Sequence, residues 1–528
     1  KPNPLEDAGT YYLQAIETPE NQEGLAGANG LREVIWAEAT PDSLLNKLNN
    51  MPVEVLLAET SVIIQEPDWA DRSTGDDNTV PMPSFVDDYI TSTDVIQNRL
   101  AFTSSSTVTM SRTDEPLNFF KKSAAGLLAT DPVEVVPGKT DAGLVQYTVA
   151  HNRDLLVFPE NGQFSLAGST PITPETVAMP QTTNYITDLS VSPISVGNVV
   201  YFATDYGDSI GISEYSGLEN TTQDEATELT KHVIGYLEGT PRILAGSAHL
   251  DMVAVVGDVD NVIYVYETNK NTDGSTSQRA WSKWVLPEDV VVKNIVFQKG
   301  GMKIIVFNGF DPAIQLWFIS VSDTAFTKDS NVLLDEKLTT PNELDDGKTY
   351  TIPNNYPADD TSLSIIAGEG CYEPYTEILT DYTYSFITDT ITFDEPVAPT
   401  GITSYIHIGR RYTSRYTPTK PFIRDENGEV VTTDPIRMKD LLVNVSGTEQ
   451  ISLEITSKYY DTEVLTFDST VLDDFDFDVV NRYTGDAIFD VNHSVDDIDF
   501  SMFTNGFLNM NINGIAYTGQ YFRTSQRI

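Results

Sequence analysis

One short pattern recurs five times in this 528-residue chain and constrains its fold more than any other feature. Each copy is an apolar run ending at an anchor residue, then a polar or glycine-containing turn, then a second apolar or alternating run. The anchors lie 56, 44, 54 and 51 residues apart, at Phe102, Phe158, Phe202, Val256 and Phe307. A hairpin that returns at this interval indicates a repeat architecture built from β-strands.

The repeat interval favours a β-propeller. Further strand-like runs, such as 144–150 and 290–297, fill the intervals, so each unit of about 50 residues has room for four strands. One four-stranded blade cannot bury both of its faces and must stack on its neighbours. The alternative is a β-sandwich of unrelated hairpins, whose loops have no reason to keep a period. Only five units are visible, so we expect closure to need a sixth from flanking sequence.

The rest of the chain is also predicted to be rich in strands. Val, Ile, Thr, Tyr and Phe dominate, and an Asn-Gly pair at Asn427 and Gly428 predicts a hairpin. Two short helices are expected: one over 41–51, where Asp42 or Ser43 is the N-cap, and one over 223–237, which is acidic at its start. The expected class is therefore mainly β, with a β-propeller core, additional small all-β domains and few short helices.

The charge balance excludes general binding of nucleic acid. The chain has 78 acidic and 32 basic residues, a net charge of -46, so neutralising phosphates cannot be its general role. A marine or salt-adapted origin would give the same acidity without functional meaning. The single cysteine, Cys371, excludes an internal disulfide and fits assembly in a reducing cytosol. No apolar run approaches the roughly 18 residues that a membrane-spanning helix needs.

Motifs that suggest catalysis or metal binding fail on their context. The G-x-S-x-G match at 207–211 is followed by a strand rather than a helix, so a hairpin turn is the better interpretation. A calcium-loop match from Asn269 has Ala280 where a bidentate Glu is required. Acidic clusters at 473–478 and 496–500 could bind a cation, but solvated strand faces are the more common explanation. The five histidines have no metal-ligand spacing.

Five arginines are candidates for binding. Three of them stand beside Tyr412 and Tyr416, and basic residues interleaved with aromatic ones can bind nucleic acid. Because the rest of the chain provides no wider positive field, ion pairs with an acidic neighbour or subunit are the favoured interpretation. The other two flank the first repeated hairpin. Taken alone they resemble phosphate-binding residues, but within a repeated unit of an acidic chain we expect them to hold neighbouring strands or subunits together. The candidate subunit or strand contacts are Arg99, Arg112, Arg410, Arg411 and Arg415.

Several stretches, in a fixed order, resemble tail tubular protein B, the tail nozzle protein of short-tailed, podovirus-type bacteriophages. The resemblance rests on "PSFVDDYITSTDVIQNRLAF", "MSRTDEPLNFF" and "ATDPVEV", and continues through "NRDLLVFPENGQFSL", "VGNVVYFA", "ELTKHVIGYL", "AWSKW" and "GQYFRTSQRI". It covers most of the chain from roughly Pro83. The chain departs from the family in its heavy acidity and in a divergent region from about 335 to 410.

The resemblance implies a structural part of the virion that is assembled in the host cytoplasm. It implies a homohexamer built around β-propellers, attached to the tail adaptor ring (tail tubular protein A), flanked by tail fibres and holding the genomic double-stranded DNA, which passes through the lumen without specific binding. It supplies no catalytic residue, metal or cofactor, so we expect no enzyme. The alternative function is a glycan-degrading or receptor-binding tail protein on a propeller.

The chain is expected to divide into four parts and to begin at Lys1 within a longer product. The parts are 1–83, the N-terminal β-rich part of a platform-like domain; 84–330, the propeller blades; 331–410, a small all-β insertion and candidate tip; and 411–528, a C-terminal β domain that helps close the propeller or platform.

Overall fold

The computed structural model describes most of the chain, in two compact units at 1–321 and 322–528. The described residues are 12–17, 34–40, 47–59, 61–139, 141–168, 170–216, 225–270, 276–308, 311–321, 332–342, 344, 346–352, 363–385, 387–424, 430–431, 435–469, 483–507 and 509–522. Their regular structure is strand, apart from 3-10 conformation at η4 (Val495–Asp497) and at Ser469, which confirms a mainly β chain. No helix in these residues is long and apolar enough to cross a membrane.

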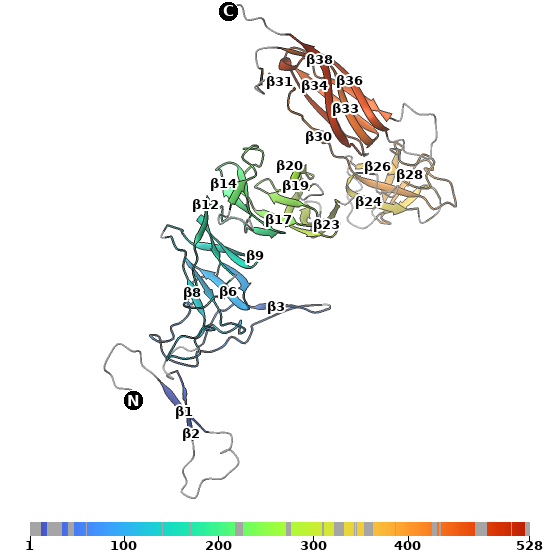
Figure 1. Ribbon diagram of the computed structural model, residues 1–528. Helices are drawn as coiled ribbons and strands as arrows, with labels where there is room; N and C mark the ends of the chain where they lie inside the picture. The colour runs from blue at the N-terminus through green and yellow to red at the C-terminus, as the bar shows by residue number, and fades with distance from the viewer. Residues whose placement is uncertain are drawn as a thin grey trace, which may run out of the picture. The chain divides into compact units, whose positions relative to one another are not determined.

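Five antiparallel sheets follow one another along the first unit (Figure 1), each with its strands in chain order. We number them sheet 1 to sheet 5; the first four have four strands and the fifth has three. Sheet 1 is β5 (Ser92–Ile96), β6 (Arg99–Ser104), β7 (Thr107–Met110) and β8 (Val133–Val135); sheet 2 is β9 (Val145–His151), β10 (Asp154–Pro159), β11 (Asn161–Leu166) and β12 (Gln181–Ile186); sheet 3 is β13 (Ile194–Val196), β14 (Val199–Asp205), β15 (Ile210–Ser216) and β16 (Glu225–Glu228); sheet 4 is β17 (Ile243–Ser247), β18 (Met252–Val256), β19 (Val262–Lys270) and β20 (Thr276–Val285); sheet 5 is β21 (Val290–Gln298), β22 (Gly301–Asn308) and β23 (Asp311–Ser320).

The repeated sequence pattern is the central hairpin of each sheet. Every anchor residue lies on the second strand of its sheet, and every predicted second run is the third strand. The predicted pairs are formed: β6 with β7, β10 with β11, β14 with β15, β18 with β19 and β22 with β23. The prediction of recurrent hairpins is therefore confirmed, whereas closure of the sheets into a propeller stays a prediction.

The second strands of sheets 1 to 4 are buried on both faces, which explains why they are almost continuously apolar. On β10, Leu155 and Val157 pack into the core between sheets 1 and 2, whereas Leu156 and Phe158 pack into the core between sheets 2 and 3. On β18, Val253 and Val255 face sheet 3 and the intervening residues face sheet 5. Because successive side chains of a strand point to opposite faces, one run of apolar residues fills two interfaces.

Both helix predictions are wrong where the structure describes the residues. Within 223–237, Glu225–Glu228 forms β16 and pairs with β15, because the edge of sheet 3 offers backbone partners that outweigh a weak helix preference. Leu229 and Leu237 then join the core between sheets 3 and 4 from turns. Within 41–51, residues 41–46 lie outside the described residues, and Leu48 and Met51 are buried on an irregular segment.

The N-terminal part of the first unit covers the outer face of sheet 1. Phe85, Phe102 and Phe119 stack there with Leu48 and Met51 in one core. Two hairpins complete this part: β1 (Leu13–Glu17) pairs with β2 (Val34–Glu38), and β3 (Glu54–Leu57) pairs with β4 (Val62–Gln65).

The second unit holds two groups of sheets, each with its own core. The first group shares one core, which includes Cys371, between the orders β24-β29-β26 and β25-β28-β27. The second is a two-sheet sandwich with the orders β30-β37-β34-β35 and β36-β33-β38. The strands are β24 (Asp335–Pro341), β25 (Thr349–Thr351), β26 (Leu363–Ala367), β27 (Tyr382–Ser385), β28 (Thr390–Phe393), β29 (Tyr405–Arg410), β30 (Ser414–Tyr416), β31 (Ile423–Arg424), β32 (Val430–Val431), β33 (Ile436–Thr448), β34 (Gln450–Ser457), β35 (Glu463–Asp468), β36 (Tyr483–Ser494), β37 (Ile498–Thr504) and β38 (Ile512–Tyr521).

Candidate functional site

Arg99 is buried and links separate segments of the first unit by hydrogen bonds. Its side chain starts at the first residue of β6 and is 1% exposed. One guanidinium nitrogen donates to the carbonyls of Ser111 and Asp131, both at 2.7 Å, and the other donates to those of Ala129 at 3.0 Å and Ile172 at 3.2 Å. Burial lowers the pKa of Arg99, and the charge of Asp131 opposes that effect. The Arg99 guanidinium thus links sheet 1 to Ile172, in the loop between β11 and β12 of sheet 2.

Arg112 belongs to the same buried region. Its guanidinium lies 2.5 Å from the carboxylate of Glu115 and 3.9 Å from that of Asp131, which is fully buried. Asp131 also accepts backbone hydrogen bonds from Lys122 at 3.2 Å and Leu128 at 2.8 Å. The two arginines therefore hold the loop before β8 rather than presenting their charge to solvent.

The three arginines of the second unit also contact acidic groups within their own unit. Arg410 lies 3.7 Å from Glu336, and Arg411 lies 2.6 Å from Glu377 and donates to the Ser364 hydroxyl at 2.9 Å. Arg410 and Arg411 are therefore each paired with a carboxylate of their own unit. We find no cluster of free positive charge here among the described residues.

Arg415 binds across the sheet that contains β30, β37 and β34. Its guanidinium donates to Glu454 at 2.7 Å and to the Ser501 hydroxyl at 2.5 Å, and it lies 4.9 Å from the ring centre of Phe503. The hydrogen bond to Glu454 raises the pKa of Arg415, and the same contact lowers the pKa of Glu454.

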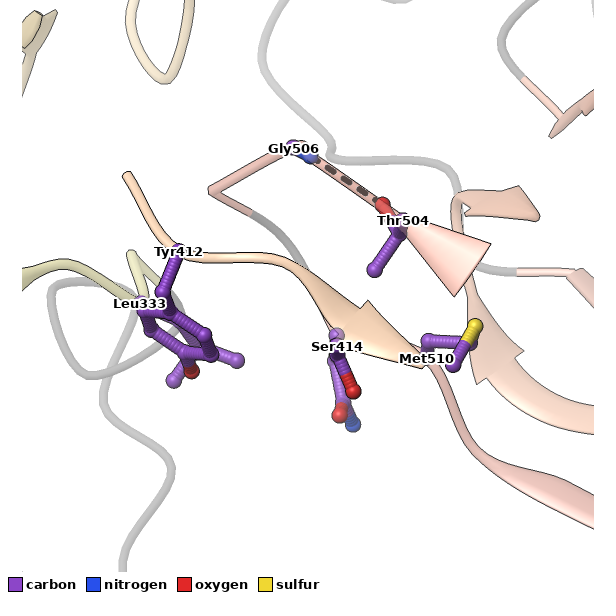
Figure 2. A pocket seen from close by; sticks show the side chains of 7 residues that line it. Leu333, Tyr412, Ser414, Thr504, Gly506 and Met510 are labelled. Carbon is purple, nitrogen blue, oxygen red and sulfur yellow. Dashed lines mark hydrogen bonds between the residues drawn. The ribbon is translucent and has the colours of Figure 1, made fainter. Parts of the chain in front are cut away.

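A small pocket lies next to the arginine-rich segment in the second unit (Figure 2). It measures about 160 Å³ and is lined by Leu333, Tyr412, Ser414, Thr504, Gly506, Asn509 and Met510. The Gly506 amide donates to the Thr504 hydroxyl at 3.1 Å. The lining side chains are apolar or neutral, so the pocket does not bring together the titratable groups that an enzyme site needs.

Asp335, on β24 near this pocket, is a perturbed group that sequence reasoning missed. The pKa of Asp335 is raised to about 6, mainly by burial and also by the neighbouring charge of Glu336, while Arg410 opposes both effects. The same carboxylate contributes to raising the pKa of Tyr412 to about 12, for which burial is the main cause. No sequence signal marks Asp335, because its burial comes from the pairing of β24 with β29.

Arg72 is a second residue that sequence reasoning missed. It is 1% exposed, lies 2.6 Å from the Asp77 carboxylate and donates to the Val80 carbonyl at 3.1 Å. The only sequence signal is the acidic turn that follows it, and acidic turns are common throughout this chain. Like Arg99, it ties a loop to a core.

The rejected motifs have the structural context that their sequences indicated. Residues 207–209 lie in the turn between β14 and β15, Ile210 and Gly211 are the first two residues of β15, and no helix follows them. The calcium-loop match lies on the β19–β20 hairpin, with 271–275 outside the described residues. Residues 473–478 and 427–428 also lie outside them. In the part of the chain that the structure describes, no group of three His, Cys, Asp or Glu side chains could hold a metal ion.

Comparison with known proteins gives one strong match. The profile of the family described as bacteriophage nozzle protein matches residues 6–528. Tail tubular protein gp12 of Escherichia phage T7 is 26% identical over 361 residues, which are 68% of this chain and 43% of that protein. The chain thus spans less than half the length of this relative.

Solved structures add little to this match. Hsv2p of Kluyveromyces lactis is 11% identical over 57% of this chain and 84% of its own, with a TM-score of 0.27. The N-terminal domain of Nup159 is 12% identical over 61% of this chain and 89% of its own, with a TM-score of 0.27. These scores are too low to assign a fold. The family profile, by contrast, covers almost every residue, and the chain belongs to the bacteriophage nozzle protein family.

Proposed function

We propose that copies of this chain form the distal, homohexameric tube of a phage tail, which retains the packaged genome and then conducts it during ejection. The observation that carries the proposal is the match of the nozzle family over residues 6–528. Tail adaptor ring and tail fibres are the proposed partners, and assembly takes place in the host cytoplasm before the part joins the virion. We propose no enzymatic step, because the family that matches this chain is described as a nozzle protein.

We also propose that sheets 1 to 5 are blades of a β-propeller. In a propeller the first strand of each blade lies nearest the axis and consecutive blades stack face to face. Two observations support this arrangement. The first strands contact one another in order, β5 with β9, β9 with β13, β13 with β17 and β17 with β21. Each pair of consecutive sheets also shares a hydrophobic core.

The proposed path of the genome lies between copies rather than along the axis of one propeller. The first strands of sheets 2 to 5 contain no Asp or Glu, so a propeller axis lined by them would not be acidic. The net charge of -46 must therefore lie on other surfaces of the chain. Six copies around a common axis would present that charge to the lumen they enclose.

An acidic lumen suits a tube that must let DNA move. Cationic contacts release condensed counterions from phosphates and so bind the strand. In sheets 3 and 4 and the loops next to them, basic side chains are engaged by acidic neighbours: Arg242 lies 2.7 Å from Asp260, Arg279 lies 3.2 Å from Glu214, and Lys283 lies 3.3 Å from Glu238. These three cations are thus paired with carboxylates of their own chain and are not free to bind phosphates.

Imaging and ejection measurements test this function. Negative-stain images of the purified chain should show six-fold rings with an axial hole, whereas monomers or trimers would contradict the tube. Acidic positions that the images place on the lumen are then changed to Lys, and genome ejection from reconstituted particles is timed at increasing salt. We expect slower ejection that recovers as salt screens the new contacts. An unchanged rate would contradict the acidic lining.

A further inference from the structure

Among the described residues, sheet 5 differs from the other four sheets because one of its faces is apolar and has no layer packed on it. Met302, Ile304 and Val306 on β22 are fully buried against sheet 4. The opposite face, which we call the open face, exposes 54% of Val296, 36% of Phe307, 72% of Ile314, 61% of Leu316 and 53% of Phe318. Apolar patches of this kind, absent from most of a soluble surface, mark interaction sites.

The register joins these side chains into one patch. Ile305 is paired with Leu316, and Phe307 is paired with Ile314, across β22 and β23. Lys303 is opposite Phe318 on one side and Val296 on the other. Side chains directly opposite one another on neighbouring strands lie in contact range, so the open face is continuous rather than a scatter of single residues.

The β3–β4 hairpin is a second apolar element of the same unit on which no other described residues pack. Leu57 is 84% exposed, Ile64 66%, Val62 60% and Val55 58%. Leu56 at 43% and Ile63 at 46% are exposed on the alternate positions, so both faces of the hairpin are apolar. A two-stranded hairpin alone is marginally stable in water, and one with two apolar faces needs a surface to pack on.

The hairpin segment and the first two strands of sheet 5 carry opposite charge, and the third strand, β23, adds one acid, Asp311. Residues 48–71, which include the hairpin, contain Glu54, Glu59 and Glu66 and no Lys or Arg. Residues 290–308, which supply two of the three strands of the open face, contain Lys293, Lys299 and Lys303 and no Asp or Glu. A basic stretch without acids is unusual in a chain of net charge -46, and it would steer an acidic hairpin toward this face.

We propose that the β3–β4 hairpin of one copy packs on the open face of sheet 5 in the neighbouring copy. Each chain has one hairpin and one open face, so the contact is head-to-tail, and a closed ring of copies leaves neither surface uncovered. In this arrangement the hairpin of the neighbouring copy occupies the place beside sheet 5 where a sixth blade of the same chain would otherwise pack. The apolar contact also lets copies associate despite their like charge. This inference rests on the proposed ring and names the interface that forms it.

Cross-linking between single-cysteine additions tests the contact. Chains carrying Leu57→Cys and Phe318→Cys, with different tags, are co-expressed and oxidised with copper phenanthroline. We expect a disulfide-linked heterodimer on non-reducing gels. Cys371, which is buried, stays in every chain, so the parent chain reports any background. Tyr89→Cys, at an 86% exposed site outside both surfaces, replaces Leu57→Cys as the matched control and should give no heterodimer.

The same pair of cysteines in one chain separates the two arrangements. Linked oligomers support the contact between copies. A faster-migrating monomer without oligomers would show that the hairpin folds back on its own sheet 5, and no link at all would show that the surfaces do not meet; either result overturns the inference.

Surface substitutions test whether the contact drives assembly. Ile64→Glu and Leu316→Glu should each weaken ring formation by about tenfold or more in sedimentation, because each places a charge in the apolar contact. Leu144→Glu, at a 64% exposed site elsewhere in the unit, is the matched control and should assemble normally. Rings that persist in both variants would overturn this interface while leaving the nozzle function standing. A parent chain that forms no ring would instead contradict the proposed hexamer.

Discussion

At the scale of single residues, Arg99 shows how the fold reassigns a charge. In the sequence it stands in a serine-rich hairpin and resembles a phosphate grip, yet its guanidinium is buried among four backbone carbonyls. A charge enclosed in this way is compatible with folding only because its hydrogen bonds are satisfied. The side chain thus acts on the joint between sheets 1 and 2 and not on DNA.

Replacing Arg99 should therefore destabilise the first unit. Arg99→Met leaves buried carbonyls without donors, and we expect a loss of about 3–5 kcal/mol in the free energy of unfolding. All five tryptophans lie between 36 and 317, so tryptophan fluorescence in urea reports this unit alone. Lys139→Ala, which removes an exposed ion pair 3.5 Å from Asp141, is the control and should cost less than about 1 kcal/mol. Equal losses in the two variants would contradict the role of Arg99.

Asp335 makes the stability of the second unit depend on pH. Its pKa is raised to about 6 from 3.8, so the native state holds a proton that the unfolded chain releases. The stabilisation is complete below about pH 4 and is lost as the pH rises through about 6. Asp335→Asn should remove this loss and be more stable by about 1–2 kcal/mol at pH 7. Calorimetry at pH 4, 5, 6 and 7 measures the stability of both proteins. If the stability of the variant falls with pH as steeply as that of the parent chain, the assignment to Asp335 is refuted.

At the scale of elements, the apolar second strands decide the architecture of the first unit. In sheets 2 to 4, each second strand supplies side chains to two cores, so one strand couples three consecutive sheets. Phe158 and Phe202 meet in this way between sheets 2 and 3, with ring centres 5.6 Å apart and neither ring exposed. The contact is non-local, and only the stacking of sheets creates it.

A cavity at this interface should be costly. Phe158→Ala is expected to lower the free energy of unfolding by about 3–5 kcal/mol, since the rigid sheets can collapse only partly around the void. Urea unfolding followed by tryptophan fluorescence measures it. Leu144→Ala, on a 64% exposed side chain, should change stability by less than about 0.5 kcal/mol. A small effect of Phe158→Ala would mean that the sheets do not stack as rigid layers.

At the scale of the whole molecule, the net charge of -46 sets the conditions for association. Copies repel one another, and the range of that repulsion falls from about 30 Å at 0.01 M salt to about 3 Å at 1 M. A protein that binds DNA through cations shows the opposite trend, with binding that weakens as salt rises.

Association of this chain should accordingly strengthen with salt. Between about 0.05 and 0.5 M NaCl, we expect the assembled fraction in analytical ultracentrifugation to rise, while retention of double-stranded DNA stays unmeasurable throughout. A sugar at matched osmolality is the control for effects other than screening. Assembly that weakens with salt would show that ion pairs between copies, rather than apolar contacts, hold them together.

The sequence by itself determined what depends on local pattern. Apolar runs around polar turns specify hairpins, and their near-constant interval specifies that one unit is repeated, so the second and third strands of all five sheets could be predicted. Motif context likewise sufficed to reject the nucleophile elbow at 207–211, and collinear stretches sufficed for the family.

Only the tertiary structure decided what depends on partners distant in sequence. The segment 225–228 has helix-like composition, yet the free edge of β15 makes it a strand. Arg99 and Asp335 gain their burial from a loop and a strand far along the chain, which no local pattern encodes. The sequence of the sheet 5 hairpin has the same apolar pattern as the hairpins of the other sheets, so it does not reveal the open face. What distinguishes it is the absence of a covering layer within the described chain, a property of the packing and not of the residues.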